Sequence, residues 1–401
     1  MTAPTGGRTA LVLSYSEIKT DPRVRREIDW LVGNGWTVDT LGLGAHPAAD
    51  VRRHFPLGRA PGWTRGRLGT LITHTLIPPR TRFRMLVSET IPVELRQAVR
   101  AGDYDLVVFN EIEFAPWLED RRDFGAAPSG RFHLDLHEYR NPDIRRRTLG
   151  GRITGAHYRW VRSHIGSARF TSRSAVNTPI GRLYAEEFGI PTPAQVRNAP
   201  PYVSDIEPLP VRDGRIRLLF HGMPSWARGF TEILEALESL PAHFTMTFML
   251  MPNPAVIDKL RAAIDRHPAR DRIEIVPPAQ MRRIAQEINE YDVEVVFYKP
   301  LEPNLEFAMP NKFFEAAQGR LAVIVGETPT MAPIVRQYRH GAVVPEFTSQ
   351  SLRDTLAALT PETVTQMKRN AAVVAQTLNA ESEGQSFLAA IASGLTEGTT
   401  S

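Results

Sequence analysis

A proline, an amide, a cation and a carboxylate fall within the segment "PNKFFEAAQG" (310–319), directly after the apolar run "YDVEVVFYKP". We expect a buried strand followed by a helix that begins at Pro310, because proline is favoured at the first helical position. The N-terminus of such a helix, around Asn311 and Lys312, presents unpaired N–H groups that bind anions. Glu315 lies one turn later, where its carboxylate would repel a phosphate but can accept two hydrogen bonds from sugar hydroxyls.

A second candidate anion site lies in "LLFHGMPSWARGF" (218–230). We expect a strand to end at His221 and Gly222, and Arg228 to open the next helix. A guanidinium can hold a phosphate through two hydrogen bonds, and a cation at a helix N-terminus is disfavoured unless an anion is present. The alternative is that Arg228 is an ordinary exposed residue at the start of a helix.

Polar residues also follow two apolar runs in the first half of the chain. "VVFNEIEFAP" contains Asn110 and Glu111, and "LDLHEYRNP" contains Asp135, His137 and Glu138. Ligands of doubly wound sheets lie beyond the carboxyl ends of the parallel strands, so a polar cluster there is hard to explain as packing. The catalytic candidates are therefore Asn110, Glu111, His137 and Glu138, with His137 the centre of the group.

The elements that must position these residues alternate between strand and helix. Predicted strands are "TALVLS", "TVDTLGL", "YDLVVF", "RFHLDL", "ARFTS" and "QVRNA" in the first half, and "RIRLLFHG", "FTMTFML", "DRIEIVP", "VEVVFY", "LAVIVG" and "GAVVP" in the second. In the first predicted helix, Val24, Ile28 and Leu31 share one face and Gly35 ends the helix. The two alternating halves predict an α/β fold with two doubly wound Rossmann-like domains and a cleft between them.

The stretch "APPYVSDIEPLPVRDG" (199–214) is rich in proline and acidic residues and marks the domain boundary. We expect an N-terminal domain over 1–204, a C-terminal domain over 205–380, and a helix from about residue 381 that packs back on the N-terminal domain. Thr360 is expected to cap a helix begun by Pro361. The last residues, "TEGTTS", have the composition of a disordered tail.

Composition excludes several classes of function. The 401 residues are 42% hydrophobic and include no cysteine, so disulfide scaffolds, thiolate metal sites and cysteine nucleophiles are excluded. No HExxH or similar spacing is present, and we expect no bound metal. No apolar segment approaches the roughly 20 residues of a membrane span, and the N-terminus lacks a signal-peptide pattern, so we expect a cytoplasmic protein.

The chain is mildly basic, with a formal charge of +4, and its arginines concentrate in "GRAPGWTRGRLGT", "PPRTRFRML" and "DIRRRTLGGR". Such runs are either solvated surface or contacts with an anionic acceptor or lipid. Apolar residues interleave with them between Arg59 and Arg84, which favours peripheral contact with the inner face of an anionic membrane as the alternative to solvated surface. No nucleic-acid partner is expected, since no recognition helix, RNP motif or zinc-finger spacing accompanies the charge.

Together these motifs resemble those of the retaining, metal-independent GT-B enzymes of glycosyltransferase family 4, and the resemblance covers most of the chain. "PNKFFEAAQGRLAVIVGE" is similar to the family's E-A-x-A-x-G-x-P-V-I, which implies that Glu315 binds the ribose of a donor nucleotide. "LLFHGMPSWARGF" is similar to G-R-x-x-x-x-K-G, which implies that Arg228 and the loop after Gly222 bind the diphosphate. The first cation of that pattern has no match, and Lys312 or Ser225 is expected to take its place.

The opening "DPRVRRE" is similar to the "DPRVxRE" of bacterial polysaccharide glycosyltransferases. The family's glycine-rich loop is replaced here by residues 16–25, so Arg23 and Arg26 either compensate for it or are solvated helix charges. Asn110 and Glu111 stand where related sequences have "HD" or "HE", whereas Asp135, His137 and Glu138 match "DxHE".

The resemblance implies transfer of a sugar from a UDP- or GDP-linked donor to a hydroxyl of a glycan, glycolipid or other acceptor. The reaction would proceed with retention, without a metal or other cofactor. Two alternatives remain open. One is a catalytically silent GT-B subunit of a glycosylation complex, suggested by the departures from the family pattern. The other is a nucleotide-sugar 2-epimerase, in which His137 and its acidic neighbours would abstract a proton.

Overall fold

The structure is a computed structural model that describes residues 7–64, 66–126, 130–141 and 149–393. The chain divides into two compact units, unit 1 (Met1–Val196 with Gly384–Ser401) and unit 2 (Arg197–Glu383). The sequence analysis placed the two crossings between domains after residue 204 and near residue 381. The predicted disordered tail, Arg65 and part of the arginine-rich run 143–152 lie outside the described residues.

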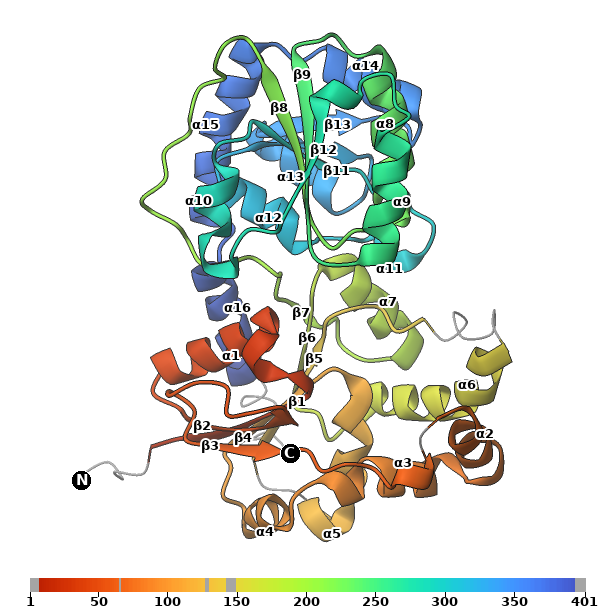
Figure 1. The fold of residues 1–401 in the computed structure, drawn as a ribbon. Helices are drawn as coiled ribbons and strands as arrows, with labels where there is room; N and C mark the ends of the chain where they lie inside the picture. Colours follow the sequence, from red (N-terminus) through yellow and green to blue (C-terminus); the bar gives the residue numbers. More distant parts are fainter. Residues whose placement is uncertain (1–6, 65, 127–129, 142–148, 394–401) are drawn as a thin grey trace, which may run out of the picture. The chain divides into compact units, whose positions relative to one another are not determined.

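Unit 1 contains a parallel sheet in the order β3-β2-β1-β4-β5-β6-β7 among its described residues. Its strands are β1 (Thr9–Glu17), β2 (Thr37–Leu43), β3 (Arg53–Pro56), β4 (Leu106–Asn110), β5 (Arg131–Leu136), β6 (Ser172–Ala175) and β7 (Ala194–Gln195). Its α-helices are α1 (Pro22–Gly33), α2 (Gly66–Leu76), α3 (Pro79–Leu86), α4 (Val93–Ala101), α5 (Arg121–Phe124), α6 (Leu149–Ser163) and α7 (Thr178–Phe188). Short 3₁₀ turns are η1 (Ile18–Thr20), η2 (Gly62–Thr64), η3 (Ser88–Thr90), η4 (Ile112–Glu119) and η6 (His164–Gly166). Figure 1 shows α1 on one side of this sheet and α4 and α5 on the other.

Helix α1 forms as its sequence predicts. The carboxylate of Asp21 accepts hydrogen bonds from two N–H groups of the first turn, and Pro22 occupies the first helical position. Val24, Ile28 and Leu31 are fully buried in the core of unit 1, which confirms the predicted apolar face. Burial of one apolar face fixes the rotation of the helix, and with it the direction of the charged residues on the remaining faces.

Unit 2 contains a second parallel sheet, in the order β10-β9-β8-β11-β12-β13 among the residues described. Its strands are β8 (Ile216–Gly222), β9 (Phe244–Leu250), β10 (Ile273–Val276), β11 (Val293–Val296), β12 (Ala322–Gly326) and β13 (Gly341–Val344). Its α-helices are α8 (Phe230–Ser239), α9 (Pro254–Ile264), α10 (Ile284–Ile288), α11 (Pro303–Glu306), α12 (Asn311–Gln318), α13 (Met331–Tyr338), α14 (Ser349–Ala357) and α15 (Pro361–Thr377), followed by α16 (Ala380–Ser393). Its 3₁₀ turns are η7 (Trp226–Arg228), η8 (Arg270–Arg272) and η9 (Met281–Arg283). Figure 1 shows α8, α9 and α14 on one side of this sheet and α10, α12 and α15 on the other.

Helix α16 enters unit 1 at Gly384. Phe387 is fully buried there, and its ring lies 5.5 Å from Trp30 and 5.2 Å from His133 between ring centroids. A side chain on Gly384 would meet the Trp30 indole at 2.6 Å, so the close approach of this helix requires a glycine. The last helix of the chain therefore contributes to the core of unit 1.

The predicted α/β fold with two doubly wound parallel sheets is confirmed, with local differences. The capping box of Thr360 before Pro361 is present. The predicted strand "ARFTS" is wrong in position, because β6 begins only at Ser172. Phe170 instead turns into the core, edge-on to Phe109. Strand β3 was missed because its four residues, "RHFP", are largely exposed and end in a proline.

Candidate functional site

In unit 2, His221 lies between two carboxylates at the carboxyl end of β8. Its Nδ1 is 2.9 Å from Oε2 of Glu294 on the neighbouring strand β11, and its Nε2 is 2.9 Å from Oε2 of Glu315 on α12. Burial alone would lower the pKa of His221, but the two carboxylates raise it to about 9. The imidazole is therefore a cation at neutral pH that donates to both neighbours and fixes one oxygen of Glu315.

Lys312, in the first turn of α12, is buried without a hydrogen-bond partner in the part of the chain that the structure describes. Its Nζ lies 3.1 Å from the centroid of the Phe220 ring and 3.8 Å from Oε1 of Glu294. Burial is the main cause that lowers the pKa of Lys312 to about 7. An ammonium group with unused donors is costly inside a protein unless an anion approaches it.

The loop after β8 lies beside Lys312. Gly222, at its start, has a φ of +103°, and a Cβ there would lie 3.9 Å from the Lys312 side chain. Gly229, at its end, has a φ of +87°, and a Cβ would meet the carbonyl oxygen of Phe297 at 2.3 Å. The loop therefore needs glycine at both positions in order to approach the neighbouring strand ends.

The other predicted ligand residues of unit 2 lie in the loop after β8 and at the start of α12. Arg228 ends the 3₁₀ turn η7 rather than opening α8, and its guanidinium lies 5.5 Å from the centroid of the Tyr298 ring. Its positive charge is one of the causes that lower the pKa of Lys312. Pro310 occupies the N-cap of α12, so that the helix begins at Asn311, and Ser225 is half-buried with no capping hydrogen bond.

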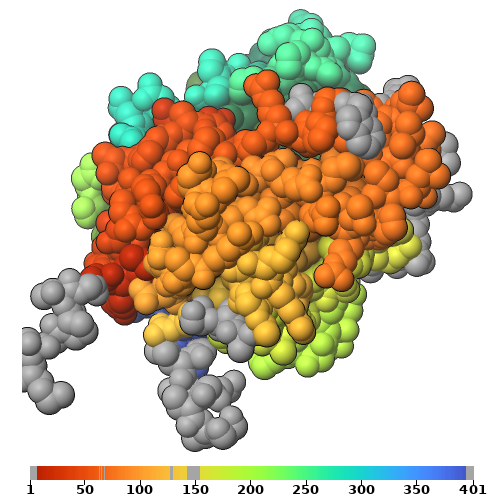
Figure 2. Space-filling view, turned by 90° about the horizontal axis from the view of Figure 1, so that it is seen from below, coloured from red at the N-terminus to blue at the C-terminus, as the bar shows by residue number. Residues whose placement is uncertain are grey.

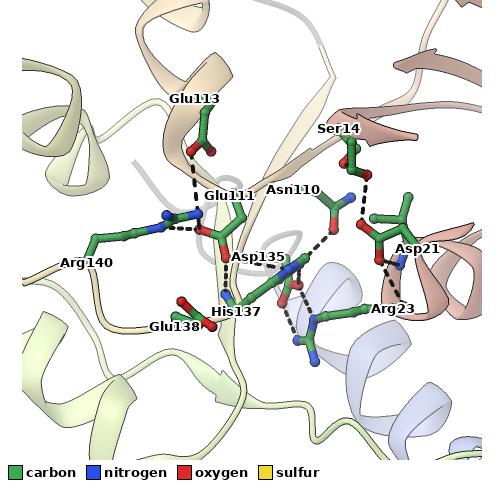
Figure 3. A network of polar contacts seen from close by, with 12 residues as sticks. Ser14, Asp21, Arg23, Asn110, Glu111, Glu113, Asp135, His137, Glu138 and Arg140 are labelled. Carbon is green, nitrogen blue, oxygen red and sulfur yellow. Dashed lines mark hydrogen bonds and ion pairs between the residues drawn. The ribbon is translucent and has the colours of Figure 1, made fainter. Parts of the chain in front are cut away.

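In unit 1, the buried carboxylate of Asp135 at the end of β5 is the centre of a second polar cluster (Figure 3). Arg23 donates to both of its oxygens, from Nε at 2.6 Å and from NH2 at 2.7 Å. His137 Nε2 lies 2.8 Å from Oδ2 of Asp135 and 3.1 Å from Oδ1 of Asn110. Burial would raise the pKa of Asp135, but Arg23 and His137 hold it well below its usual value.

Glu111 joins this cluster from a strained backbone. Its φ of 62° and ψ of 176° lie in a region that is almost confined to glycine. The conformation is held by the N–H of His137, which donates to Oε1 of Glu111 at 3.1 Å, and by Arg140, whose Nε donates to Oε2 at 2.8 Å. Such strain costs about 1–3 kcal/mol, persists only where surrounding contacts enforce it, and is frequent at functional sites.

His137 is more basic than an ordinary histidine. Burial alone would lower its pKa, but Glu111 and Asp135 raise it above the usual value of 6.5. A protonated imidazole can donate a hydrogen bond to a ligand oxygen but cannot accept a proton. Glu138, the remaining predicted catalytic residue, is exposed, and its carboxylate makes no contact with the other residues drawn in Figure 3.

Glu27 of α1 completes the cluster in unit 1. It is fully buried, and its carboxylate lies within 4.8 Å of ligand atoms of both Asp135 and His137, a grouping that could in principle hold a metal ion. However, both oxygens of Asp135 already accept from Arg23. Burial, together with the charge of Asp135, also raises the pKa of Glu27 well above its usual value. The group therefore fits a shared proton better than a cation.

Sequence reasoning named some of these residues and missed others. It did not assign site roles to His221, Glu294 or Glu27. It left open whether Arg23 and Arg26 are solvated helix charges, but both are buried, so that alternative is wrong. A carboxylate inside the apolar run "VEVVFY" was the one available signal for Glu294, because a buried charge requires a partner.

The chain was compared with known proteins. No family model matches it, and no curated protein matches its sequence. Sucrose-phosphate synthase from Thermosynechococcus elongatus is 16% identical with a TM-score of 0.68 over 95% of this chain and 98% of the other. HepE of Anabaena in complex with UDP is 13% identical, with a TM-score of 0.67 over 96% and 100%. Trehalose 6-phosphate synthase from Burkholderia multivorans is 12% identical, with a TM-score of 0.62 over 98% and 100%. These likenesses establish that the chain has the two-domain GT-B fold.

The basicity of His137 can be tested through Glu111. We expect Glu111→Gln to lower the pKa of His137, because one of the two negative charges that raise it is removed. The ring C–H resonance of His137, assigned from a His137→Gln spectrum, would be followed by NMR across a pH titration. Glu113→Gln is the matched control, since Glu113 contacts Arg140 at 3.4 Å and shows no contact with His137. An unchanged midpoint in Glu111→Gln, or an equal fall in both variants, would contradict the assignment.

Proposed function

We propose that this protein is a glycosyltransferase that moves a sugar from a nucleoside-diphosphate sugar to an acceptor hydroxyl. The observation that carries the proposal is Lys312, a buried ammonium with no hydrogen-bond partner among the described residues, in the first turn of α12. In its ammonium form, Lys312 adds a positive charge to the N–H groups and dipole of a helix N-terminus, which favours a bound phosphate.

The donor would lie across the carboxyl edge of the unit 2 sheet. Its diphosphate would accept hydrogen bonds from Lys312, Arg228 and the first N–H groups of α12, with the loop 222–229 close against it. Glu315 lies one turn further along α12, and its oxygen that His221 does not hold is free to accept from the ribose. The cation at the start of α12 thus suits the anionic phosphates of a nucleotide, and the carboxylate one turn later suits the hydroxyls of its ribose.

We propose UDP as the first nucleotide to test. HepE, which shares the fold, has been solved with UDP, with UDP and glucose, and with UDP-glucose. The leaving group of the reaction would be UDP, whose β-phosphate gains negative charge as the anomeric bond breaks. Lys312 and Arg228 can stabilise that charge without a metal ion, because they are fixed before the reaction begins.

In unit 1, the cluster around Asp135 is suited to orienting hydroxyl groups. The imidazole of His137 can donate, and the carboxylates of Glu111 and Glu138 can accept, so that together they can hold a sugar at two or more positions. Glu111 and Asp135 raise the pKa of His137 and so favour its protonated form, which cannot act as a base. The departing phosphate oxygen is therefore the expected proton acceptor. That assignment corresponds to a same-face reaction with retention.

The two alternatives predict different chemistry. A silent binding subunit would bind the nucleotide without consuming its sugar. A nucleotide-sugar 2-epimerase would interconvert donor sugars in the absence of any acceptor. Slow release of UDP from a UDP-sugar, without epimer formation, is the outcome expected of the transferase.

We also propose peripheral contact with an anionic membrane through α2. None of the described helices is long and apolar enough to cross a bilayer. On α2, however, Leu68 is 69% exposed and Leu76 is 76% exposed, and the arginines of α3 follow directly. Exposed leucines beside cations are typical of segments that rest on anionic lipid.

The membrane contact can be tested with two leucine substitutions. The double change of Leu68→Ser and Leu76→Ser should weaken binding to phosphatidylglycerol vesicles at least about tenfold, because each buried leucine contributes on the order of 1.5 kcal/mol or more. Val93→Ser, at a 63% exposed position of α4, is the control. Binding that is equally poor to neutral and anionic vesicles at low salt would remove the proposal.

The donor site is tested by Glu315→Ala. We expect UDP affinity to fall by on the order of 3 kcal/mol, or roughly a hundredfold, because hydrogen bonds to a charged acceptor are lost. The measurement is isothermal titration calorimetry in EDTA, with melting temperatures to confirm folding. Glu346→Ala, at an exposed position of the same unit, should bind like the wild type. Unchanged UDP affinity in a folded Glu315→Ala protein would exclude this donor site.

The pH dependence of UDP binding tests Lys312. Its pKa of about 7 in the free protein should rise when a diphosphate binds, since the anion stabilises the ammonium form. Binding at pH 8 is therefore expected to take up a proton, and affinity should fall as pH rises above about 7, by at most about tenfold per pH unit. Titrations in Tris and in HEPES should give different apparent enthalpies for the wild type but not for Lys312→Met. Equal wild-type enthalpies in the two buffers would contradict the assignment.

A further inference from the structure

A hollow of about 610 Å³ opens in unit 1 between α3, η4 and α6. Figure 2 looks onto the side of unit 1 where α3, α4 and α5 are drawn in orange. The hollow is lined by side chains from Arg80 to Ser88 on one side and by the end of η4 and the second half of α6 on the others. Its volume falls within the range of about 300–1,000 Å³ that is usual for small-ligand sites.

The hollow is separate from the candidate site of unit 1. A crossover helix runs antiparallel to the strands it connects, so the end of α6, with Trp160, and the following η6, with His164, lie toward the amino edge where β6 begins. Asp120 likewise precedes α5 and the start of β5. His137 and Asp135 lie at the opposite, carboxyl edge. None of the residues proposed for the transfer reaction lines the hollow.

The three arginines of the motif "PPRTRFRML" have different surroundings. One is buried and hydrogen-bonded to the backbone, and two line the hollow. Arg82 is buried and donates from Nε and NH2 to the carbonyl oxygens of Thr73 and Ile77, which end α2. Arg80 and Arg84, one helical turn apart, are exposed and line the hollow. Like charges at this spacing repel each other, and Arg80 in the first turn of α3 is also opposed by the helix dipole. Arg84 is paired with Glu89 at 3.3 Å. An anion beside Arg80 would offset the remaining repulsion and the effect of the helix dipole.

Ser88 supplies an independent indication of a ligand. It is 2% exposed and lines the hollow, and its hydroxyl has no hydrogen-bond partner among the residues that the structure describes. Ser88 begins η3, just after the end of α3. The volume of the hollow accommodates a ligand longer than a single phosphate.

The other walls suit hydroxyl groups. His164 Nδ1 donates to the carbonyl oxygen of Trp160 at 2.8 Å, which leaves Nε2 as an acceptor. Burial lowers the pKa of His164, so the ring is neutral at pH 7. Asp120 and Arg122 line the hollow as an ion pair, in which both carboxylate oxygens accept from the guanidinium. The half-buried Trp160 indole adds an apolar surface. Alternating donors and acceptors beside an aromatic ring match a sugar, whose hydroxyls both donate and accept.

We propose that this hollow binds an acidic saccharide of about two rings, with its carboxylate or phosphate at Arg80 and its hydroxyls along Ser88, Trp160 and His164. The inference does not rest on the proposed transfer reaction, because it concerns a different edge of unit 1. Arg80 sets the preference for an anion, and the facing acceptors set the preference for a sugar.

The test is calorimetric titration of the full chain with digalacturonate, trehalose 6-phosphate, trehalose and inorganic phosphate. We expect saturable binding of at least one acidic disaccharide, and the better of the two identifies the anionic group. Arg80→Ala should weaken that binding at least about tenfold. Arg182→Ala, an exposed arginine on α7, is the control and should bind like the wild type.

The variant Ser88→Ala distinguishes a loss of saccharide binding from a loss of stability. Since the hydroxyl has no partner in the described structure, its removal should leave the melting temperature unchanged or higher while it weakens saccharide binding. No saturable binding of either acidic disaccharide would overturn the proposal, as would equal affinity in Arg80→Ala and wild type. Inorganic phosphate bound as tightly as the better disaccharide would overturn the assignment to a saccharide.

Discussion

Asp135 lies fully buried at the end of β5, and a carboxylate in that position stays ionised only with a cation against it. Arg23 supplies that cation through two hydrogen bonds, and also donates from NH1 to the carbonyl oxygen of Val196 at 2.8 Å. Arg23 thus connects α1 to β5 through Asp135, and to the residue that follows β7 through Val196. The negative charge of Asp135 also acts on two neighbours: together with Glu111 it raises the pKa of His137, and together with burial it raises the pKa of Glu27.

In unit 2, too, a buried carboxylate requires a cation beside it. Glu294 is fully buried in β11, and His221 and Lys312 both lie near it. One ring N–H of His221 donates to Glu294, and the other donates to Glu315. Glu294 on β11 therefore fixes, through His221, the position of Glu315 on α12. Lys312 is left at 3.8 Å from Glu294 with its donors unused. Lys312 is therefore the cation of this group whose donors no described residue accepts, whereas the Arg23 guanidinium in unit 1 is held by Asp135.

Backbone geometry supports both clusters. Gly229 allows the loop after β8 to lie against Phe297, at a distance that no other residue would permit. Glu111 accepts a conformation that glycine would adopt without cost, and its two side-chain contacts compensate for the strain. A glycine at that position would remove the strain and the carboxylate together. The strain is therefore tied to the contacts that the Glu111 carboxylate makes with His137 and Arg140.

The sequence by itself determined most helices and strands, and it indicated that the polar candidates lie at the carboxyl edges of the two sheets. Apolar periodicity predicted both parallel sheets and the buried face of α1, because local pattern decides which residues must leave water. The position of Glu315 one turn into α12, and of His137 after β5, followed from strand and helix order alone. Short or exposed elements such as β3 were missed, since they bury too little apolar surface to leave a pattern.

Tertiary structure decided which charges meet. Arg23 and Asp135 are far apart in the chain, as are His221, Glu294 and Glu315, and no local pattern specifies such pairs. Their protonation states depend on burial and on neighbours contributed by other strands, so ordinary pKa values would assign several of them wrongly. Even the motif "PPRTRFRML", uniform in sequence, was divided by packing into one structural arginine and two that line a hollow. Residue types are fixed by the sequence, whereas the dielectric and the partners that give them function exist only in the folded chain.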